Sequence, residues 1–230
     1  MAGRLYGVGV GPGDPELVTL KALKVIKKCS VIAFPGKAPE ESTAYNIAKK
    51  AYPGLKDKEL TGIYLPMSKD EELLKKSHKE GADLICNILD QGKDIAFLTL
   101  GDASLYSTYI YLHEEVIKRG YDAKIISGIT SFCASAAALG ISLAQKDEEL
   151  HVIPASYEIK EALALPGTKV LMKAGRKIKD VKGFLTENEI FAVMVENCSM
   201  EGERIYKGAE NFPDDAGYYS LIIIKEDMQR

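Results

Sequence analysis

Short apolar runs alternate with helical repeats of apolar positions along the first half of the chain. The runs end at small or turn-forming residues, as buried strands do, and they cover 5–10, 30–34, 63–66, 95–100 and 122–126. Between them, apolar residues recur at helical spacing and predict helices near 15–28, 42–51, 70–91 and 106–119. This alternation indicates an α/β fold with a largely parallel sheet.

The second half of the chain has a different order of elements, because its predicted strands follow one another with shorter connections. Helices are predicted over 131–139 and near 158–164 and 177–186. Strands are predicted over 150–155, 168–173, 190–196 and, as a hairpin-like end, 203–207 and 218–225. The pattern predicts a second α/β lobe with a mixed sheet. We place the boundary between the two lobes near 126–145 and divide the chain into an N-terminal lobe, 1–126, and a C-terminal lobe, 127–230.

The composition narrows the class of protein. The 230 residues are 46% hydrophobic and 27% charged, which is typical of a soluble globular protein with a sizeable core. The net charge of −3 and the absence of a basic run argue against nucleic-acid binding, and the apolar runs are too short to span a membrane. The N-terminus lacks the apolar stretch of a signal peptide, and the four scattered cysteines predict reduced thiols of a cytoplasmic protein.

A glycine-rich turn follows the first strand. Residues 7–13 carry four glycines, yet G-x-G-x-x-G is absent, because the positions that would need glycine hold Pro12 and Asp14. A tight turn capped by Asp14, with Pro15 at the first helical position, explains part of the pattern. Four glycines exceed what such a turn requires, so we favour a close approach of the backbone to a ligand.

Two more small-residue turns follow strands of the same lobe. Gly101-Asp102-Ala103-Ser104 comes after the fourth predicted strand, and Ser127-Gly128-Ile129-Thr130-Ser131 comes after the fifth. Each could be an ordinary strand–helix turn, with Asp102 or Ser104 as the helix N-cap in the first case. Ligands of α/β proteins, however, bind at the carboxyl ends of strands, so three such turns in one lobe predict a shared pocket.

The sequence offers no complete set of acid–base or nucleophilic residues. The three histidines are scattered without metal-ligand spacing, and no cysteine lies in a nucleophile motif. The paired carboxylates are most simply solvated faces of helices and turns. We therefore predict no catalytic side chain and no metal site, and expect any chemistry to depend on positioning a reactive cofactor.

At the three turns the chain resembles the tetrapyrrole (corrin and porphyrin) methylases, which use S-adenosylmethionine and are unrelated to Rossmann-type methyltransferases. The matching pieces occur in the family's order: YGVGVGPGDPELVTLKA at 6–22, LTLGDASLYST at 98–108, SGITSFCASAAALG at 127–140 and VLMKAGR at 170–176. Within the family, GDASLYST, the LPM segment at 65–67 and the SLIIIK ending resemble the precorrin-2 C20-methyltransferases.

The resemblance implies the class III methyltransferase fold, with two α/β lobes and the cofactor between them, and a homodimer. It places Pro12 in the loop beside the cofactor and the tetrapyrrole trough. The other cofactor-binding residues that it implies are Gly101, Asp102, Leu105, Thr130, Ser131 and, from the second lobe, Met172. Porphyrin-branch relatives carry an acidic residue after the second strand, where this chain reads Phe34-Pro35-Gly36, so no general base is carried across.

The activity implied by the resemblance is S-adenosylmethionine-dependent methylation of precorrin-2, or of its cobalt-bearing form, at C20 in cobalamin biosynthesis. S-adenosyl-L-homocysteine is then the second product. Two alternatives stay open: a corrin-ring methylase of the same fold that acts at another carbon, and a non-catalytic ligand-binding module that keeps the pocket. We expect Lys, Arg or backbone donors to hold the carboxylates of the tetrapyrrole substrate.

Overall fold

The computed structural model of the chain describes residues 1–154 and 159–225. The predicted end of one strand at 155 and the predicted start of one helix at 158 lie outside these residues. The chain divides into two compact units, Met1–Thr130 and Ser131–Arg230. The sequence places the division four residues earlier, after 126. That the first lobe carries the substrate trough and the second completes the cofactor site, as the resemblance implies, stays a prediction.

The first unit is built on a five-stranded sheet whose strands all run parallel, in the spatial order β3-β2-β4-β1-β5. The strands are β1 Leu5–Gly9, β2 Val31–Pro35, β3 Glu59–Ile63, β4 Ile95–Thr99 and β5 Ala123–Ile126. Because they are parallel, the loops that follow all five leave from one edge of the sheet, which we call the carboxyl edge. The predicted parallel α/β fold is confirmed.

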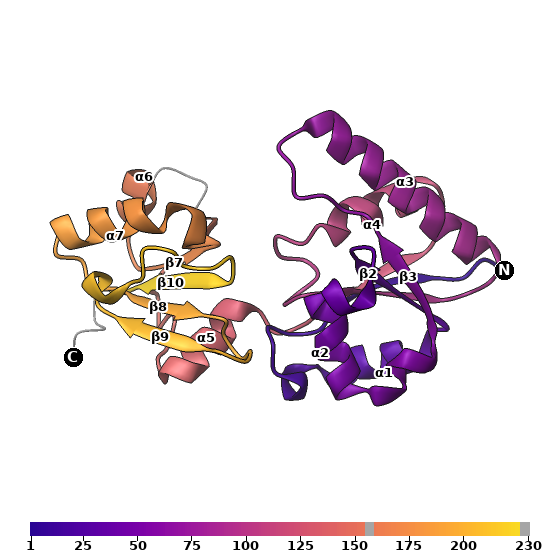
Figure 1. The fold of residues 1–230 in the computed structure, drawn as a ribbon, viewed down its shortest axis with the longest axis horizontal. Coiled ribbons are helices and arrows are strands. Elements are labelled where there is room, and N and C mark those ends of the chain that lie inside the picture. The colour runs from indigo at the N-terminus through magenta and orange to yellow at the C-terminus, as the bar shows by residue number, and fades with distance from the viewer. Residues whose placement is uncertain (155–158, 226–230) are drawn as a thin grey trace. The chain divides into compact units, whose positions relative to one another are not determined.

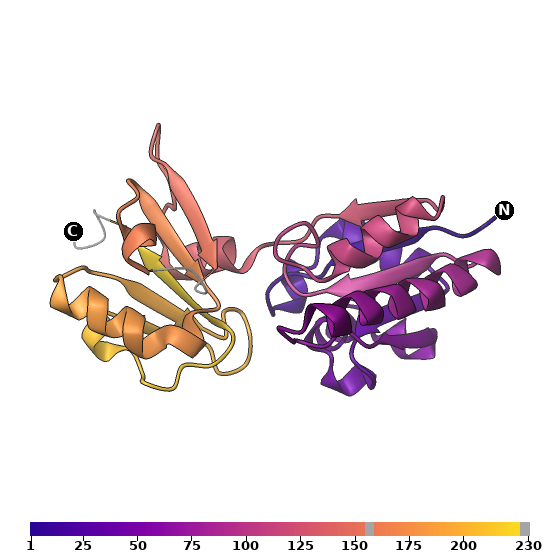
Figure 2. The same cartoon turned by 90° about the horizontal axis from the view of Figure 1, so that it is seen from above.

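Helices cover both faces of this sheet (Figures 1 and 2). They are η1 Pro15–Leu17, α1 Leu20–Lys28, η2 Pro39–Glu41, α2 Thr43–Ala51, η3 Pro53–Asp57, α3 Glu71–Asp90 and α4 Tyr109–Lys118. α1 and α2 pack on the face that carries Val8 and Leu98, and α3 and α4 pack on the face that carries Leu5 and Phe97. Alternate residues therefore enter opposite cores, and the strands read as continuous apolar runs.

The chain enters α1 differently from the prediction. Asp14 accepts a backbone hydrogen bond (2.8 Å) that caps only the short η1. α1 begins at Leu20, where Thr19 Oγ1 accepts the Ala22 N–H (3.1 Å). A single helix from 15 is therefore wrong, because Thr19 provides a second cap that starts a separate helix. Leu20, the first residue of α1, is 76% exposed.

Two further boundaries differ from the prediction. The strand expected at 63–66 lies earlier, because parallel pairing with β2 sets its register from Val31 opposite Glu59 onward. α4 begins only at Tyr109, because Tyr106 has a left-handed φ of 47°, which no α-helix contains. The reading of Asp102 or Ser104 as the N-cap of this helix is therefore wrong.

The second unit holds a five-stranded sheet of order β6-β7-β10-β8-β9. The sheet is mixed, as predicted. Its strands are β6 Leu150–Pro154, β7 Thr168–Met172, β8 Val193–Glu196, β9 Arg204–Lys207 and β10 Ser220–Ile224. Only β6 and β7 pair in parallel; the other pairs are antiparallel. The predicted hairpin of the last two strands is wrong, because β10 is apolar on both faces and occupies the buried position between β7 and β8.

Helices cover both faces of the second sheet as well. They are α5 Ser131–Leu139, α6 Ile159–Leu163, η4 Ala174–Lys177, α7 Ile178–Glu187 and η5 Ala209–Asn211. α6 and α7 pack against Leu171 and Ile222, and α5 packs against Val170 and Ile223. The two α/β lobes expected from the resemblance are thus present. Within the described residues, no helix is long and apolar enough to cross a membrane.

Candidate functional site

The three small-residue turns of the first unit meet at the carboxyl edge of its sheet. Gly11 and Gly101 form an isolated antiparallel bridge, in which the Gly11 N–H donates to the Gly101 carbonyl (3.1 Å) and the Gly101 N–H donates to the Gly11 carbonyl (2.9 Å). The third turn is tied to Thr19, the N-cap of α1, by a longer bond from Thr19 Oγ1 to the Ser127 carbonyl (3.4 Å). The turns predicted to share a pocket therefore lie together.

Three glycines bring these backbones into direct contact. A Cβ atom on Gly9 would lie 2.6 Å from the Gly101 carbonyl oxygen and 2.8 Å from the Gly128 nitrogen, and one on Gly128 would lie 2.1 Å from the Gly101 oxygen. Two residues earlier, on the same face of β1, a Cβ atom on Gly7 would overlap the Tyr109 ring at 2.0 Å. Backbone-to-backbone and backbone-to-ring packing accounts for Gly7, Gly9 and Gly128. The approach of a ligand to the glycine-rich turn stays a prediction.

The Asp102 carboxylate connects the second turn to the third. Its Oδ1 accepts hydrogen bonds from the Ser104 N–H (2.8 Å) and the Ser104 hydroxyl (2.5 Å), and its Oδ2 accepts the Gly128 N–H (2.8 Å). Burial of the carboxylate raises its pKa, but these three bonds outweigh burial and hold the pKa below the usual range for aspartate. Asp102 is therefore an anion whose acceptors are occupied by the protein, and it fixes the shape of the corner.

A pair of hydroxyl groups anchors the start of α4 to the end of β4. Thr99 Oγ1 and Ser107 Oγ lie 2.8 Å apart, and Ser107 Oγ also accepts the Tyr109 N–H (3.2 Å). Tyr109 is fully buried, with its hydroxyl 2.9 Å from His113 Nδ1. The segment between Gly101 and α4 is thus held at both ends.

The sequence-predicted residues of the first unit lie around this corner. Pro12 is buried next to the bridging Gly11, and Leu105 is half-buried one turn after Asp102. Thr130 lies two residues after Gly128, and its hydroxyl oxygen is buried without a hydrogen-bond partner among the described residues. The prediction did not name Gly9 or Gly128 as site residues, although each is a glycine at or just after the end of a strand.

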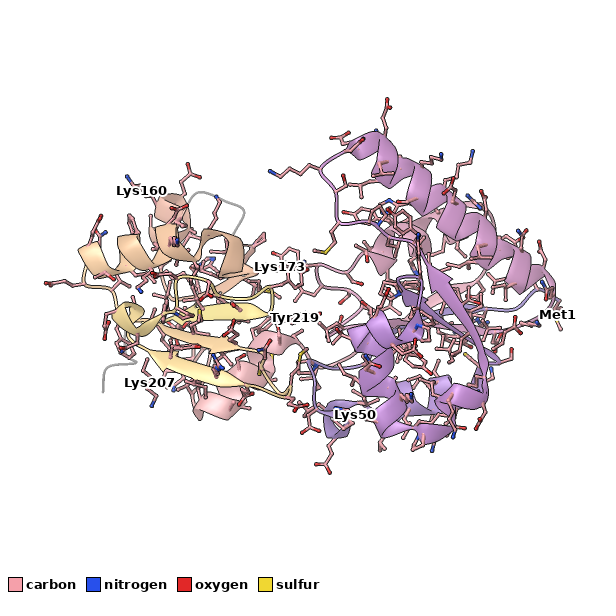
Figure 3. The ribbon with its side chains drawn as sticks, in the orientation of Figure 1. Met1, Lys50, Lys160, Lys173, Lys207 and Tyr219 are labelled. Atoms are coloured by element: carbon pink, nitrogen blue, oxygen red, sulfur yellow. The ribbon has the colours of Figure 1, made fainter. Side chains whose placement is uncertain are left out.

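The two remaining predicted residues belong to the second unit. Ser131 is the first residue of α5. Met172 ends β7, pairs with Leu221 of β10 and packs against the apolar cluster under α5. Lys173, labelled in Figure 3, follows it with a left-handed φ of 60°. The roles of both residues, like the position of the cofactor between the lobes, stay predictions.

Reactive side chains do not gather at the corner. Three cysteines are buried and one, Cys133, is exposed, and all four are free thiols. Burial raises the pKa of the Cys29 thiol to about 12. No group of three or more His, Cys, Asp or Glu within the described ranges could hold a metal ion. The corner can therefore bind and orient a molecule, chiefly through backbone groups and one hydroxyl.

Residues 4–211 match the pattern of a protein family, the Tetrapyrrole (Corrin/Porphyrin) Methylases. The chain belongs to this family. The glycine-rich turn, the Gly-Asp corner and the Thr130 turn all fall inside the matched residues, so the resemblance found at these turns is confirmed.

Curated relatives resemble the chain over almost its full length. A protein of Methanocaldococcus jannaschii named "Probable cobalt-precorrin-2 C(20)-methyltransferase" is 34% identical, and the alignment covers 96% of each chain. The precorrin-2 C(20)-methyltransferase of a Sinorhizobium species is 31% identical over 96% of this chain and 95% of its own. Uroporphyrin-III C-methyl transferase from Thermus thermophilus, solved with S-adenyl homocysteine, has a TM-score of 0.73 at 20% identity, covering 97% and 98%.

Proposed function

We propose that this protein transfers a methyl group from S-adenosylmethionine to C20 of precorrin-2, in its cobalt-bearing form, during cobalamin biosynthesis. The observation that supports this most is the corner of Gly9, Gly101 and Gly128, since its three turns carry the family's motifs and meet at the carboxyl edge of a parallel sheet. The relatives named as C20-methyltransferases align over almost the entire chain.

The residues at the corner fit S-adenosylmethionine. The molecule presents an amino acid group, a ribose and an adenine, all of which take hydrogen bonds from backbone N–H and C=O groups and from hydroxyls. The buried Thr130 hydroxyl lacks a partner among the described residues, and a buried hydroxyl without one is costly. A polar ligand group at Thr130 would remove that cost. Gly101, with a φ of 69°, presents its backbone there without a side chain.

S-adenosylmethionine supplies a methyl group already activated on a sulfonium, so the protein needs no nucleophile of its own. The chain's contribution is to hold the cofactor and the substrate and to orient them toward each other. Asp102 keeps the Gly101 turn and the Gly128 turn in fixed register, and the Thr99–Ser107 pair holds the segment that carries Leu105. Fixed orientation of two reactants can lower a barrier by roughly 7–11 kcal/mol in favourable cases. This contribution needs no acid–base pair, and the proton that C20 loses on methylation passes to solvent water.

The order of preference among substrates follows the relatives. The relative with 34% identity is named for the cobalt-bearing substrate and the one with 31% for precorrin-2 itself, so we prefer cobalt-precorrin-2.

We further propose that the protein is a cytoplasmic homodimer. The free thiols of all four cysteines support a reducing compartment.

Methyl transfer to precorrin-2, with and without inserted cobalt, tests the proposal. We expect turnover with S-adenosylmethionine, faster on the cobalt-bearing substrate, and a product whose new methyl group is assigned to C20 by NMR. A methyl group on another carbon would show a corrin methylase of different regiospecificity. Cofactor binding without turnover on either substrate would show a non-catalytic binding module.

A further inference from the structure

The loops after β2 and β3 place a cation beside exposed apolar side chains at the carboxyl edge. The Lys37 ammonium lies 5.5 Å from the centre of the Tyr64 ring. Tyr64 is 52% exposed and Met67, on the same loop, is 69% exposed. We call Lys37, Tyr64 and Met67, which all lie on these two loops, the loop platform. Large apolar side chains exposed together with a cation are characteristic of a binding surface.

The backbone fixes the position of Lys37. The Gly36 N–H donates to the Ile63 carbonyl (2.9 Å), and Gly36 has a φ of 116°, which favours glycine. A Cβ atom on Gly62 would lie 2.5 Å from the Gly36 carbonyl oxygen and 2.9 Å from that of Lys37. The loop after β2 is therefore clamped onto the end of β3, and the lysine leaves from a defined place.

The exposure of Tyr64 and Met67 also has a structural cause. Leu65, between them, packs into the core that α3 and α4 form with the sheet. Asp70 accepts the Glu72 N–H (3.0 Å) and starts α3 just beyond. The segment from Leu65 to Asp70 is thus anchored at both ends, and its two large side chains stay on the surface although burial would stabilise them.

We propose that Lys37 binds a carboxylate of the tetrapyrrole substrate while Tyr64 and Met67 contact its ring system. This assignment rests on the proposed function. A reduced tetrapyrrole combines apolar ring faces with acetate and propionate groups on its rim, which matches a cation next to exposed apolar side chains. Lys37 pairs with no carboxylate in the described parts of the chain, so its charge is available to the substrate.

Steady-state kinetics of Lys37→Met test the assignment. We expect the KM for the tetrapyrrole to rise about fivefold, as for one partly solvated charge contact. The kcat and the KM for S-adenosylmethionine stay unchanged, because Lys37 is not at the Gly101 corner. Lys37→Arg restores the wild-type KM to within about twofold, since the charge remains. Added salt weakens tetrapyrrole binding to the wild type more than to Lys37→Met.

Lys50→Met is the matched control. Lys50, labelled in Figure 3, is an exposed lysine of the same unit near the end of α2, which leads away from the carboxyl edge. Its loss removes the same charge and should leave the KM for the tetrapyrrole unchanged. An equal rise in this control would indicate bulk attraction, and an unchanged KM in Lys37→Met would refute the contact.

Failure of the proposed function can be distinguished from failure of this assignment. If the wild type transfers no methyl group to precorrin-2, the proposed function is refuted. The assignment is then tested by fluorescence titration with uroporphyrin III, a polycarboxylic tetrapyrrole. Weaker binding to Lys37→Met than to wild type and Lys50→Met supports the contact. Equal binding to all three, or none to wild type, overturns it.

Discussion

At the scale of single residues, Asp102 is the side chain on which the corner depends. One carboxylate accepts three hydrogen bonds from two turns that are far apart in sequence. An asparagine has one oxygen acceptor, and its NH2 group would face a donor. We expect Asp102→Asn to lower the free energy of unfolding by about 1–3 kcal/mol and to weaken cofactor binding. Urea denaturation and calorimetric titration measure both quantities.

The pH dependence of stability gives Asp102 a signature of its own. The folded pKa lies below the ordinary value of 3.8, so the unfolded chain takes up the proton first as the pH falls. The stabilisation by Asp102 is complete above that value and is lost as the pH falls through the folded pKa. We therefore expect the difference in stability between wild type and Asp102→Asn to shrink below about pH 3.8. Asp215→Asn, at an exposed aspartate of the second unit, is the control substitution.

At the scale of elements, the ends of β1, β4 and β5 lie in backbone contact because the glycines there carry no side chains. A methyl group on Gly128 would meet backbone atoms of Gly101 and Gly9, which cannot move as a flexible side chain can. We expect Gly128→Ala to cost about 3 kcal/mol or more of stability. Urea denaturation, with S-adenosyl-L-homocysteine binding as a second readout, measures the loss.

The second unit offers a matched glycine. Gly183 lies in α7, and a methyl group there has open space around it. Gly183→Ala should therefore stabilise the protein by about 0.5–1 kcal/mol, because alanine loses less backbone entropy in a helix. A similar loss of stability in both variants would contradict the packing argument at the corner.

At the scale of the whole molecule, the chain consists of two compact units, each with helices on both faces of its own sheet. A ligand that binds only the folded protein adds stability in proportion to the logarithm of its concentration. At 100 times its Kd, S-adenosyl-L-homocysteine should add about 2.7 kcal/mol and raise Tm by roughly 5–10 °C. Scanning calorimetry measures the shift, with adenosine as the control. No shift at saturating ligand would contradict the cofactor assignment.

The sequence by itself determined the features that depend on neighbouring residues. Alternating apolar runs and helical repeats specified the parallel α/β unit and the mixed second sheet, and the motifs around Pro12, Gly101 and Thr130 specified the family. Local caps were found less well, because Asp14 and Thr19 both fit the rule and each caps a helix. Such competition between nearby caps is not visible in periodicity.

Only the tertiary structure decided which distant segments touch. The insertion of β10 between β7 and β8 depends on pairing across many residues, and a hairpin was the simpler local solution. The contact of Gly9, Gly101 and Gly128 likewise joins three backbones, and a glycine in sequence does not reveal what occupies the space beside it. The same holds for Lys37 and Tyr64, which are brought together by the register of β2 with β3. These contacts arise from folding and leave no local pattern.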